Sequence, residues 1–312
     1  MSMEMRIRIA GFITALLLTF AGNGVAIAEE PIALVTAEWL KANLDKPGIR
    51  IVDVSGRTDT FGKERLPSAV QVKRHLDLGD LSKLPPTLYP SKNQYEVLMS
   101  RLGITPDTIV VAYDDAFNLY AARMLFIMEL YGHDTGKLKM LDGGSAHWKS
   151  LNYPMSTEAA AVAAPTYKVD QTRMERRLRR DDVLRDVVMG ANAGVVLHDA
   201  RPDKEYKAEN IRSIRGGRIP GAINVTGANA VAETHLFKPI DEIRKMYAEA
   251  GITSDKEVYT YCHSGDRSAY GYITLKHLLG YDKVRSYDGS WIEWSTDLSL
   301  PAECQVWAWA AK

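Results

Sequence analysis

The chain repeats itself once, and this repeat constrains its fold more than any other feature. At an offset of 148 positions, residues 103–132 and 251–280 agree at nine of thirty positions, with a Gly-Ile-Thr-x-Asp start and a closing Gly. Farther along, an offset of 146 aligns Trp148 with Trp294. Units of this length can each bury a core, so the repeat predicts two similar domains and not a solenoid.

Short β-branched runs alternate with amphipathic segments in both units. The runs predict strands over residues 49–54, 108–113, 194–198 and 257–261. Strands that alternate with helices are typical of an α/β fold, here two tandem domains that each hold a mostly parallel sheet flanked by helices. Asp53 and Asp199 end equivalent strands, which predicts a shared structural hydrogen-bonding role, and the repeated tryptophans are expected in the cores.

The domain boundary falls in residues 157–166, which are small, Ala-rich and closed by Pro165, as in a linker. This places a first domain at 29–156 and a second at 167–312. The basic run 173–185 has apolar residues at helical spacing, which predicts a solvated helix face. Because basic and acidic residues number 39 each, we expect no nucleic-acid partner.

The first 28 residues have the pattern of a cleaved signal peptide. Arg6 and Arg8 precede an apolar run over 9–20, and Ala26-Ile27-Ala28 resembles a cleavage site. The apolar run is shorter than the roughly 20 residues that a spanning helix needs. We therefore expect a periplasmic or secreted protein that, after cleavage, has no membrane anchor; a monomer is the default expectation.

Two cysteines, Cys262 and Cys304, are too few for a fold built on disulfides. In an oxidising compartment these two could pair with each other. The tail around Cys304, with Val306, Trp307 and Trp309, is expected to pack on a domain surface. No metal-ligand spacing and no phosphate-binding or dinucleotide-binding loop occurs, so no metal and no cofactor are expected.

The two repeats differ most informatively directly after equivalent strands. The second reads Cys-His-Ser-Gly-Asp-Arg-Ser over 262–268, whereas the first has Asp114 in the place of Cys262. Ligands gather at the carboxyl ends of parallel strands, where a following helix supplies backbone N–H groups. A thiol at a helix N-terminus beside an arginine is stabilised as the thiolate, and converging donors can hold an anionic intermediate.

The motif Cys-x-x-Gly-x-Arg-Ser, between a strand and a helix, resembles the active-site loop of the rhodanese family. Supporting motifs are Asp-Ala-Arg at 199–201, Gly-Arg-Ile-Pro-Gly-Ala-Ile-Asn at 217–224 and Tyr-Asp-Gly-Ser-Trp-x-x-Trp at 287–294. The resemblance covers nearly all of the chain after residue 28. It implies tandem rhodanese-like domains of the thiosulfate or 3-mercaptopyruvate sulfurtransferase type, the first silent and the second catalytic.

In such a protein Cys262 would be the nucleophile. It would take a sulfane sulfur from a small anionic donor, with thiosulfate favoured, and pass it through a persulfide to cyanide or a thiol. The resemblance implies a binding loop made by His263, Ser264, Gly265, Asp266, Arg267 and Ser268, with Arg201 and Arg267 as cations for the donor. His263 is equally consistent with a solvent-facing residue and with a donor-binding residue. Asp266 is expected to be a loop or helix-start residue.

Three alternatives remain open. The donor could be 3-mercaptopyruvate, or the protein could be a persulfide carrier that does not turn over small donors. A phosphatase fits less well, because its loop has five residues between Cys and Arg and this one has four. Arg212, Arg215 and Arg218 could extend an anion funnel, although a solvated loop is the simpler interpretation. A site at the domain interface would involve Arg57 or Asp114.

Overall fold

The computed structural model describes residues 29–56, 61–158 and 160–304. Within this part of the chain lie two five-stranded sheets, each entirely parallel. The expected signal peptide (1–28), Arg57, and the tail residues Val306, Trp307 and Trp309 lie outside the described residues. Among those described, no helix is both long and apolar enough to cross a membrane.

The first domain has strand order β1-β5-β4-β2-β3. Its elements are β1 (Ala33–Val35), α1 (Ala37–Lys41), β2 (Ile49–Asp53), β3 (Val70–Gln71), α2 (Arg74–Asp77), α3 (Lys92–Arg101), β4 (Ile109–Tyr113), α4 (Leu119–Leu130), β5 (Leu138–Leu141) and α5 (Gly144–Ser150).

The second domain has the matching order β6-β10-β9-β7-β8. Its elements are β6 (Arg177–Leu178), α6 (Arg180–Val183), β7 (Val195–Asp199), α7 (Asp203–Tyr206), β8 (Ala222–Asn224), α8 (Ile240–Glu249), β9 (Glu257–Tyr261), α9 (Asp266–Ile273), β10 (Val284–Tyr287) and α10 (Ser290–Thr296).

The predicted α/β fold and duplication are confirmed, and the four strands expected from the sequence are β2, β4, β7 and β9. Trp148 and Trp294 are both fully buried, and each indole N–H donates to a proline carbonyl. Tyr113 Oη donates to Asp53 and Tyr261 Oη donates to Asp199, at 2.8 and 2.6 Å. The two aspartates therefore have the shared structural role that the repeat predicts.

The expectation of a helix face over 173–185 is wrong for its first half. Residues 177–178 form the edge strand β6, which pairs with β10, and the helix begins only at Arg180. The arginines before it are held by carboxylates rather than by water: Arg173 and Arg176 bind Glu29, and Arg177 binds Asp288. Ion pairing and strand pairing thus override the helical spacing of the apolar residues.

The connection between the domains extends beyond the expected linker. Val169 N–H donates to Glu96 of α3, and Tyr167 N–H donates to the hydroxyl of Ser100. Tyr167 also packs edge-on against Tyr95. Residues 167–169, which were expected in the second domain, therefore lie on the surface of the first.

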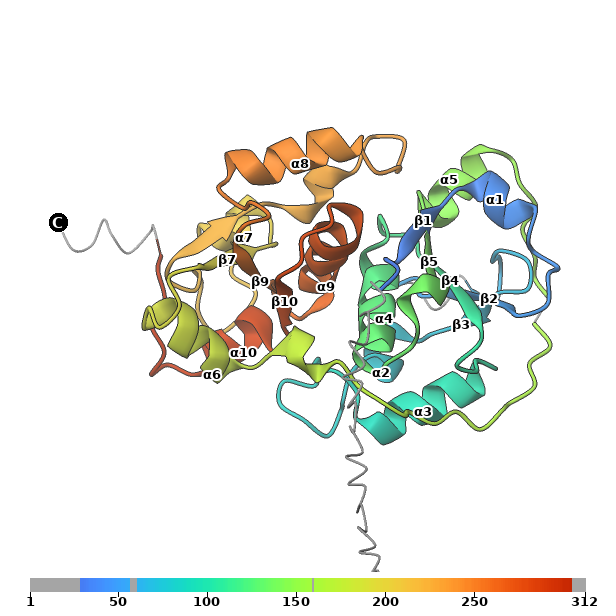
Figure 1. Cartoon of the computed structure of the whole chain (residues 1–312), viewed down its shortest axis with the longest axis horizontal. Helices are drawn as coiled ribbons and strands as arrows, with labels where there is room; N and C mark the ends of the chain where they lie inside the picture. The colour runs from blue at the N-terminus through green and yellow to red at the C-terminus, as the bar shows by residue number, and fades with distance from the viewer. Residues whose placement is uncertain (1–28, 57–60, 159, 305–312) are drawn as a thin grey trace, which may run out of the picture.

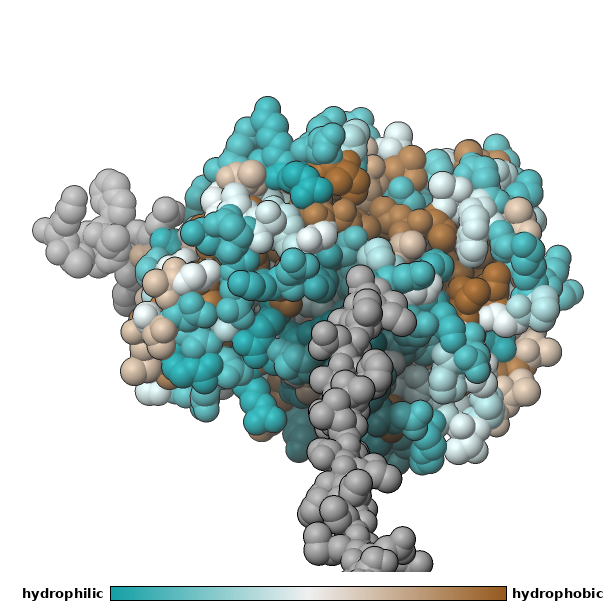
Figure 2. Space-filling model, viewed as in Figure 1, coloured by the Kyte–Doolittle hydropathy of each residue, from teal (hydrophilic) through white to brown (hydrophobic). Residues whose placement is uncertain are grey.

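Helices α4 and α9 face each other where the two domains meet (Figure 1). Residues 121–130 of α4 are all buried, as expected of a helix with apolar residues on every side, since its own sheet covers one face and α9 the other. Phe126 contacts Tyr272, and the buried carboxylate of Glu129 is bound by Arg176, Tyr272 and His277. Figure 2 shows a largely hydrophilic surface, with hydrophobic residues gathered at the upper end of this junction.

Candidate active site

Cys262 follows β9 directly and lies at the start of the loop that leads into α9. Its side chain is buried. Gly265 N–H donates to Cys262 Sγ at 3.1 Å, while the N–H of Cys262 itself donates to Ser290 Oγ at 3.2 Å. Because the loop closes into helix α9, a sulfur anion at this position meets a backbone donor and the positive end of a helix.

Gly265 is required by its backbone conformation and by a neighbour from the first domain. It has φ +95° and serves as the N-cap of α9. A Cβ at this position would lie 2.3 Å from Arg123 Nη1. Glycine tolerates this region of backbone space and the close approach, which gives the Gly of the predicted motif its physical reason.

Ser290 is a site residue that the sequence reasoning did not single out. It adopts φ +52°, which is rare for a side chain larger than Gly, and the equivalent residue of the first repeat is Gly144 with the same φ. Its hydroxyl accepts the Cys262 N–H and lies 4.0 Å from Sγ. Strained residues of this kind gather at functional sites. The exchange of Gly for Ser between the repeats was the available signal.

Arg267 lies beside the thiol but does not stand free. Its two terminal nitrogens donate to the carboxylate of Glu205 at 2.9 and 3.3 Å, and Arg212 donates to the same group at 3.1 Å. Burial alone would lower the pKa of Arg267, but negative charge at Cys262 and Glu205 raises it. Glu205 was not predicted from the sequence, because nothing in its local pattern links α7 to the loop.

His263 is buried rather than solvent-facing. Desolvation lowers its pKa to about 4, and the nearby charge of Arg212 acts in the same direction. Its Nδ1 is buried without a partner among the described residues. Desolvation therefore keeps the His263 ring neutral at ordinary pH, with a buried nitrogen that has no partner among the described residues.

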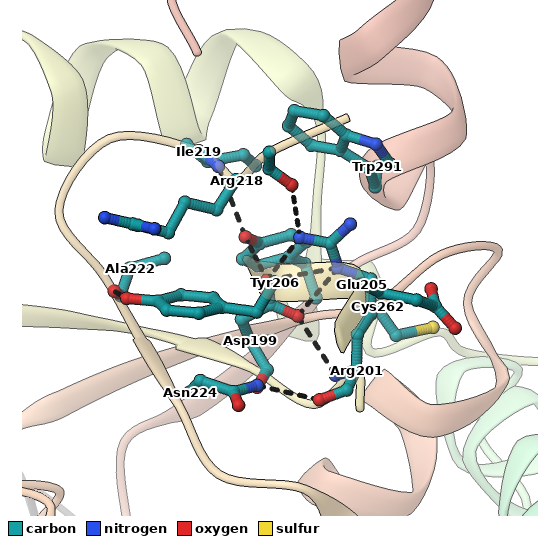
Figure 3. Close-up of polar contacts among 12 residues, drawn as sticks. Asp199, Arg201, Glu205, Tyr206, Arg218, Ile219, Ala222, Asn224, Cys262 and Trp291 are labelled. Atoms are coloured by element: carbon teal, nitrogen blue, oxygen red, sulfur yellow. Dashed lines mark hydrogen bonds and ion pairs between the residues drawn. The ribbon is translucent and has the colours of Figure 1, made fainter. Parts of the chain in front are cut away.

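Arg201 does not have the exposed guanidinium that was expected to bind the donor. It is buried, its Nε and Nη2 donate to Asp199, and Nη2 also donates to the carbonyl of Gly217. Figure 3 shows its guanidinium between Asp199 and the ring of Trp291, 4.8 Å from the ring. Arg201 therefore holds the end of β7 and the loop before β8 together, and its contact with a donor stays a prediction.

The serines of the loop have different surroundings. Ser268 is fully buried, and its hydroxyl donates to the carbonyl of Gly265, so this side chain supports the first turn of α9. Ser264 is half-buried, and its hydroxyl donates to Asp266 at 3.3 Å. Ser264 also lines a cleft with Arg74, His75 and Thr87 of the first domain. The first domain thus forms most of this cleft, to which the Cys262 loop contributes Ser264 and Asp266.

The loop of the first domain that starts at Asp114 is equivalent to the Cys262 loop and shows which kind of group its backbone N–H donors hold. The Asp114 carboxylate is buried there and accepts four backbone N–H groups at 2.7 to 3.0 Å, from Ala116, Asn118, Tyr120 and Ala121. Burial raises the pKa of Asp114 to about 6, although the four hydrogen bonds act against this rise. A strand, a loop and a helix of this geometry therefore form a cradle for an anion, which an aspartate fills in one repeat and a cysteine occupies in the other.

The remaining candidates lie away from the thiol. Cys262 and Cys304 are both free, which excludes the disulfide between them in this structure. Arg215 donates to the carbonyls of Trp294 and Asp297, and Arg218 pairs with Glu303, so neither extends an anion funnel. Within the described residues no group of three or more His, Cys, Asp or Glu side chains could hold a metal ion.

The fold and site define a tandem α/β protein with a cysteine at the strand-to-helix loop of its second domain, and comparison with known proteins agrees. The Rhodanese-like domain family matches residues 36–151 and 185–297. The chain therefore belongs to the rhodanese family and has two such domains.

Relatives and solved structures are consistent with this assignment. The thiosulfate sulfurtransferase of Corynebacterium glutamicum is 33% identical over 283 residues, covering 88% of this chain and 91% of that protein. The sulfur carrier protein TtuD of Thermus thermophilus is 32% identical over 281 residues, covering 87% and 96%. Wild-type EanB has the same fold, with a TM-score of 0.75 at 23% identity over 87% of this chain and 69% of its own.

Proposed function

We propose that the protein is a sulfurtransferase that moves a sulfane sulfur through a persulfide on Cys262, with thiosulfate as the favoured donor. The observation that carries this proposal is the pair of equivalent loops: the Asp114 carboxylate fills one anion cradle, and Cys262 Sγ lies in the other with a backbone N–H at 3.1 Å. A group that is stable as an anion, such as a thiolate or persulfide, suits this position.

The proposed chemistry has two displacement steps. The Cys262 thiolate attacks the outer sulfur of thiosulfate, a new S–S bond forms, and the donor S–S bond breaks with its electron pair leaving on sulfite. The acceptor, cyanide or a thiolate, then attacks the outer sulfur of the persulfide, and its bond to Cys262 breaks to return the thiolate. The backbone N–H of Gly265 faces Cys262 Sγ, which bears the negative charge before the first step and again after the second.

Arginines around the loop favour an anionic donor. Arg267 lies beside Cys262 and is 20% exposed, and Arg74 of the first domain lines the adjoining cleft. Guanidinium groups suit oxyanions such as thiosulfate and the carboxylate of 3-mercaptopyruvate alike, although Arg267 and Arg74 would first have to release part of their pairing with Glu205 and Asp266. The same residues therefore support 3-mercaptopyruvate as the second candidate donor.

A second candidate function is a persulfide carrier. Cys262 is fully buried in this structure, so a sulfur placed on it would be shielded from solvent. A relative over nearly the whole chain is named a sulfur carrier protein. A carrier would hold the persulfide until an acceptor opens the loop, whereas an enzyme would exchange it rapidly with small molecules.

The test is sulfur transfer to cyanide from thiosulfate and from 3-mercaptopyruvate, with residues 29–312 of the wild type, Cys262→Ser and Cys304→Ser. We expect thiocyanate from the wild type and from Cys304→Ser, no thiocyanate from Cys262→Ser, and one added sulfur on Cys262 by mass spectrometry. A persulfide that forms but turns over negligibly would support the carrier. Equal activity in Cys262→Ser would refute both.

Export to the periplasm or the medium is part of the proposal and rests on residues 1–28. The expected partners are the small donor and acceptor alone, acting on a monomer. Cell fractionation of the full chain, with mass determination of the mature N-terminus, should give a protein that begins at Glu29 outside the cytoplasm. A full-length protein in the cytoplasm would contradict export.

A further inference from the structure

Asp266 is a carboxylate placed where the proposed chemistry would least tolerate one. It is the first residue of α9, four positions after Cys262, and its side chain is buried. A negative charge beside a thiol opposes formation of the thiolate, and it also repels an anionic donor. The site therefore needs a compensating charge close to Asp266.

The first domain supplies this charge. Arg74, the first residue of α2, donates from Nε to Asp266 Oδ1 at 3.0 Å and from Nη2 to Oδ2. The guanidinium therefore binds both carboxylate oxygens. The Arg74 guanidinium also lies over the ring of Tyr120, 4.3 Å from its centre. A planar ion pair of this kind is both directional and strong.

Arg123 is a second cation at Asp266, and its charge also lowers the pKa of that carboxyl, but its hydrogen bonds go elsewhere. Its Nε lies 3.6 Å from Asp266 Oδ1, and its three nitrogens donate to backbone carbonyls of Leu78, Thr87 and Ser264. Arg123 is almost completely buried, whereas Arg74 keeps 15% of its side chain exposed in the cleft that Ser264 lines. Arg74 is thus the cation of this pair that remains accessible.

We propose that Arg74 of the first domain is a positioning residue for sulfur transfer, which with Arg123 neutralises Asp266 and so removes a negative charge that would oppose the Cys262 thiolate and an anionic donor. This inference rests on the proposed function, because it takes Cys262 as the nucleophile. It gives the first domain a role in the site although the domain has no reactive cysteine.

The electrostatics of Arg74 agree with this role. Burial alone would lower its pKa, but the hydrogen bond and charge of Asp266, and to a smaller extent the charge of a Cys262 thiolate, raise it. Arg74 therefore responds to the charge on the thiol as well as to its partner. On the other side of the thiol, Arg267 is paired with Glu205 in the same way.

A purely structural role would leave a different signature. If the Arg74–Asp266 pair only fastened the two domains together, removing either partner would disturb the loop in the same direction. If the pair sets the charge at Cys262, removing the arginine and removing the aspartate must have opposite effects. The double variant must then return toward the wild type.

The experiment measures alkylation of Cys262 at pH 7 by neutral iodoacetamide and by anionic iodoacetate, in a Cys304→Ser background. The variants are Arg74→Gln, Asp266→Asn, their combination, and Arg74→Lys. Arg101→Gln is the control, because it removes the same charge from the same domain at an exposed pair with Asp77. Thermal unfolding of each variant shows that it is folded.

We expect Arg74→Gln to slow both reagents and to lower the iodoacetate-to-iodoacetamide ratio by at least about threefold. Asp266→Asn should raise the rates and the ratio, the double variant should lie near the wild type, and Arg74→Lys should recover part of the loss. Arg101→Gln should leave the ratio unchanged. Equal slowing by both single variants, with an unchanged ratio, would overturn the inference.

The alkylation result and the sulfur-transfer result are separable. Alkylation needs only a reactive thiol, so the expected pattern without any thiocyanate formation would refute the proposed enzyme and leave the role of Arg74 intact. Normal alkylation of Arg74→Gln in a protein whose wild type transfers sulfur would refute the role of Arg74 alone.

Discussion

Replacing Gly265 by Ala tests whether Arg123 of the first domain packs closely against the Cys262 loop. The new Cβ would lie 2.3 Å from Arg123 Nη1, in a residue whose φ is +95°. The left-handed conformation costs a non-glycine residue about 1–2 kcal/mol. Overpacking against a buried side chain costs about 1–3 kcal/mol more. We expect Gly265→Ala to lower the free energy of unfolding by about 2–5 kcal/mol and to reduce sulfur transfer.

The matched control is Gly280→Ala, at the end of the same helical segment. Gly280 has φ +74°, but nothing lies within 4 Å of its Cβ position, so only the conformational cost of about 1–2 kcal/mol applies. The free energies come from urea unfolding of both variants, followed by tyrosine and tryptophan fluorescence. Equal losses in the two variants would refute the overpacking argument, since only the Cβ at Gly265 meets neighbours, namely Arg123 and the carbonyl of Asp288.

Two further substitutions probe the thiol's immediate neighbours. Ser290→Ala removes the acceptor of the Cys262 N–H and should lower kcat/KM for sulfur transfer about tenfold, equivalent to roughly 1.4 kcal/mol; unchanged kinetics would exclude a role for this hydroxyl. His263→Gln tests the buried ring, whose pKa lies near 4 in the folded chain against 6.5 in the unfolded one. Between pH 6.5 and 4 the histidine therefore binds a proton in the unfolded chain but not in the folded one. The free energy of unfolding of the wild type should then fall by up to about 3 kcal/mol relative to the variant as the pH falls from 7 to 4. Urea midpoints measured at both ends of this range would contradict the prediction if the two proteins lost stability in parallel.

The fold could be predicted because the information on it is local and repeated. The β-branched runs that became β2, β4, β7 and β9 carry their own signal, and the repeat doubles the evidence for each. The prediction of one helix over 173–185 failed because the partner that decides this segment is distant in the sequence. Leu178 pairs with Tyr287 in β10, more than a hundred residues later, and no pattern of apolar spacing records such a partner.

The site residues also fall into two groups: those that a local motif reveals, and those that reach the site from distant parts of the chain. Cys262, Gly265 and Arg267 lie in one short segment, so a motif could reveal them together. Glu205 pairs with Arg267 from α7, and Arg74 reaches Asp266 from the other domain. Arg201 shows the same limit: its charge and position suggested an anion site, but the sequence did not show that Asp199 pairs with its guanidinium. Sequence identifies charged groups well but does not show which of them are already paired.

The pseudo-equivalent loops also explain why one domain can lose its cysteine without losing its place in the protein. Asp114 satisfies four N–H groups that would otherwise lie buried without partners, so the silent loop keeps its shape without a bound anion. A rigid first domain can then hold Arg74 and Arg123 against Asp266 and Gly265. The Cys262 loop has one N–H donor on the sulfur and so keeps capacity for further negative charge. Stability in one repeat and reactivity in the other thus follow from the same backbone cradle, filled by a carboxylate in the first case and by a thiol in the second.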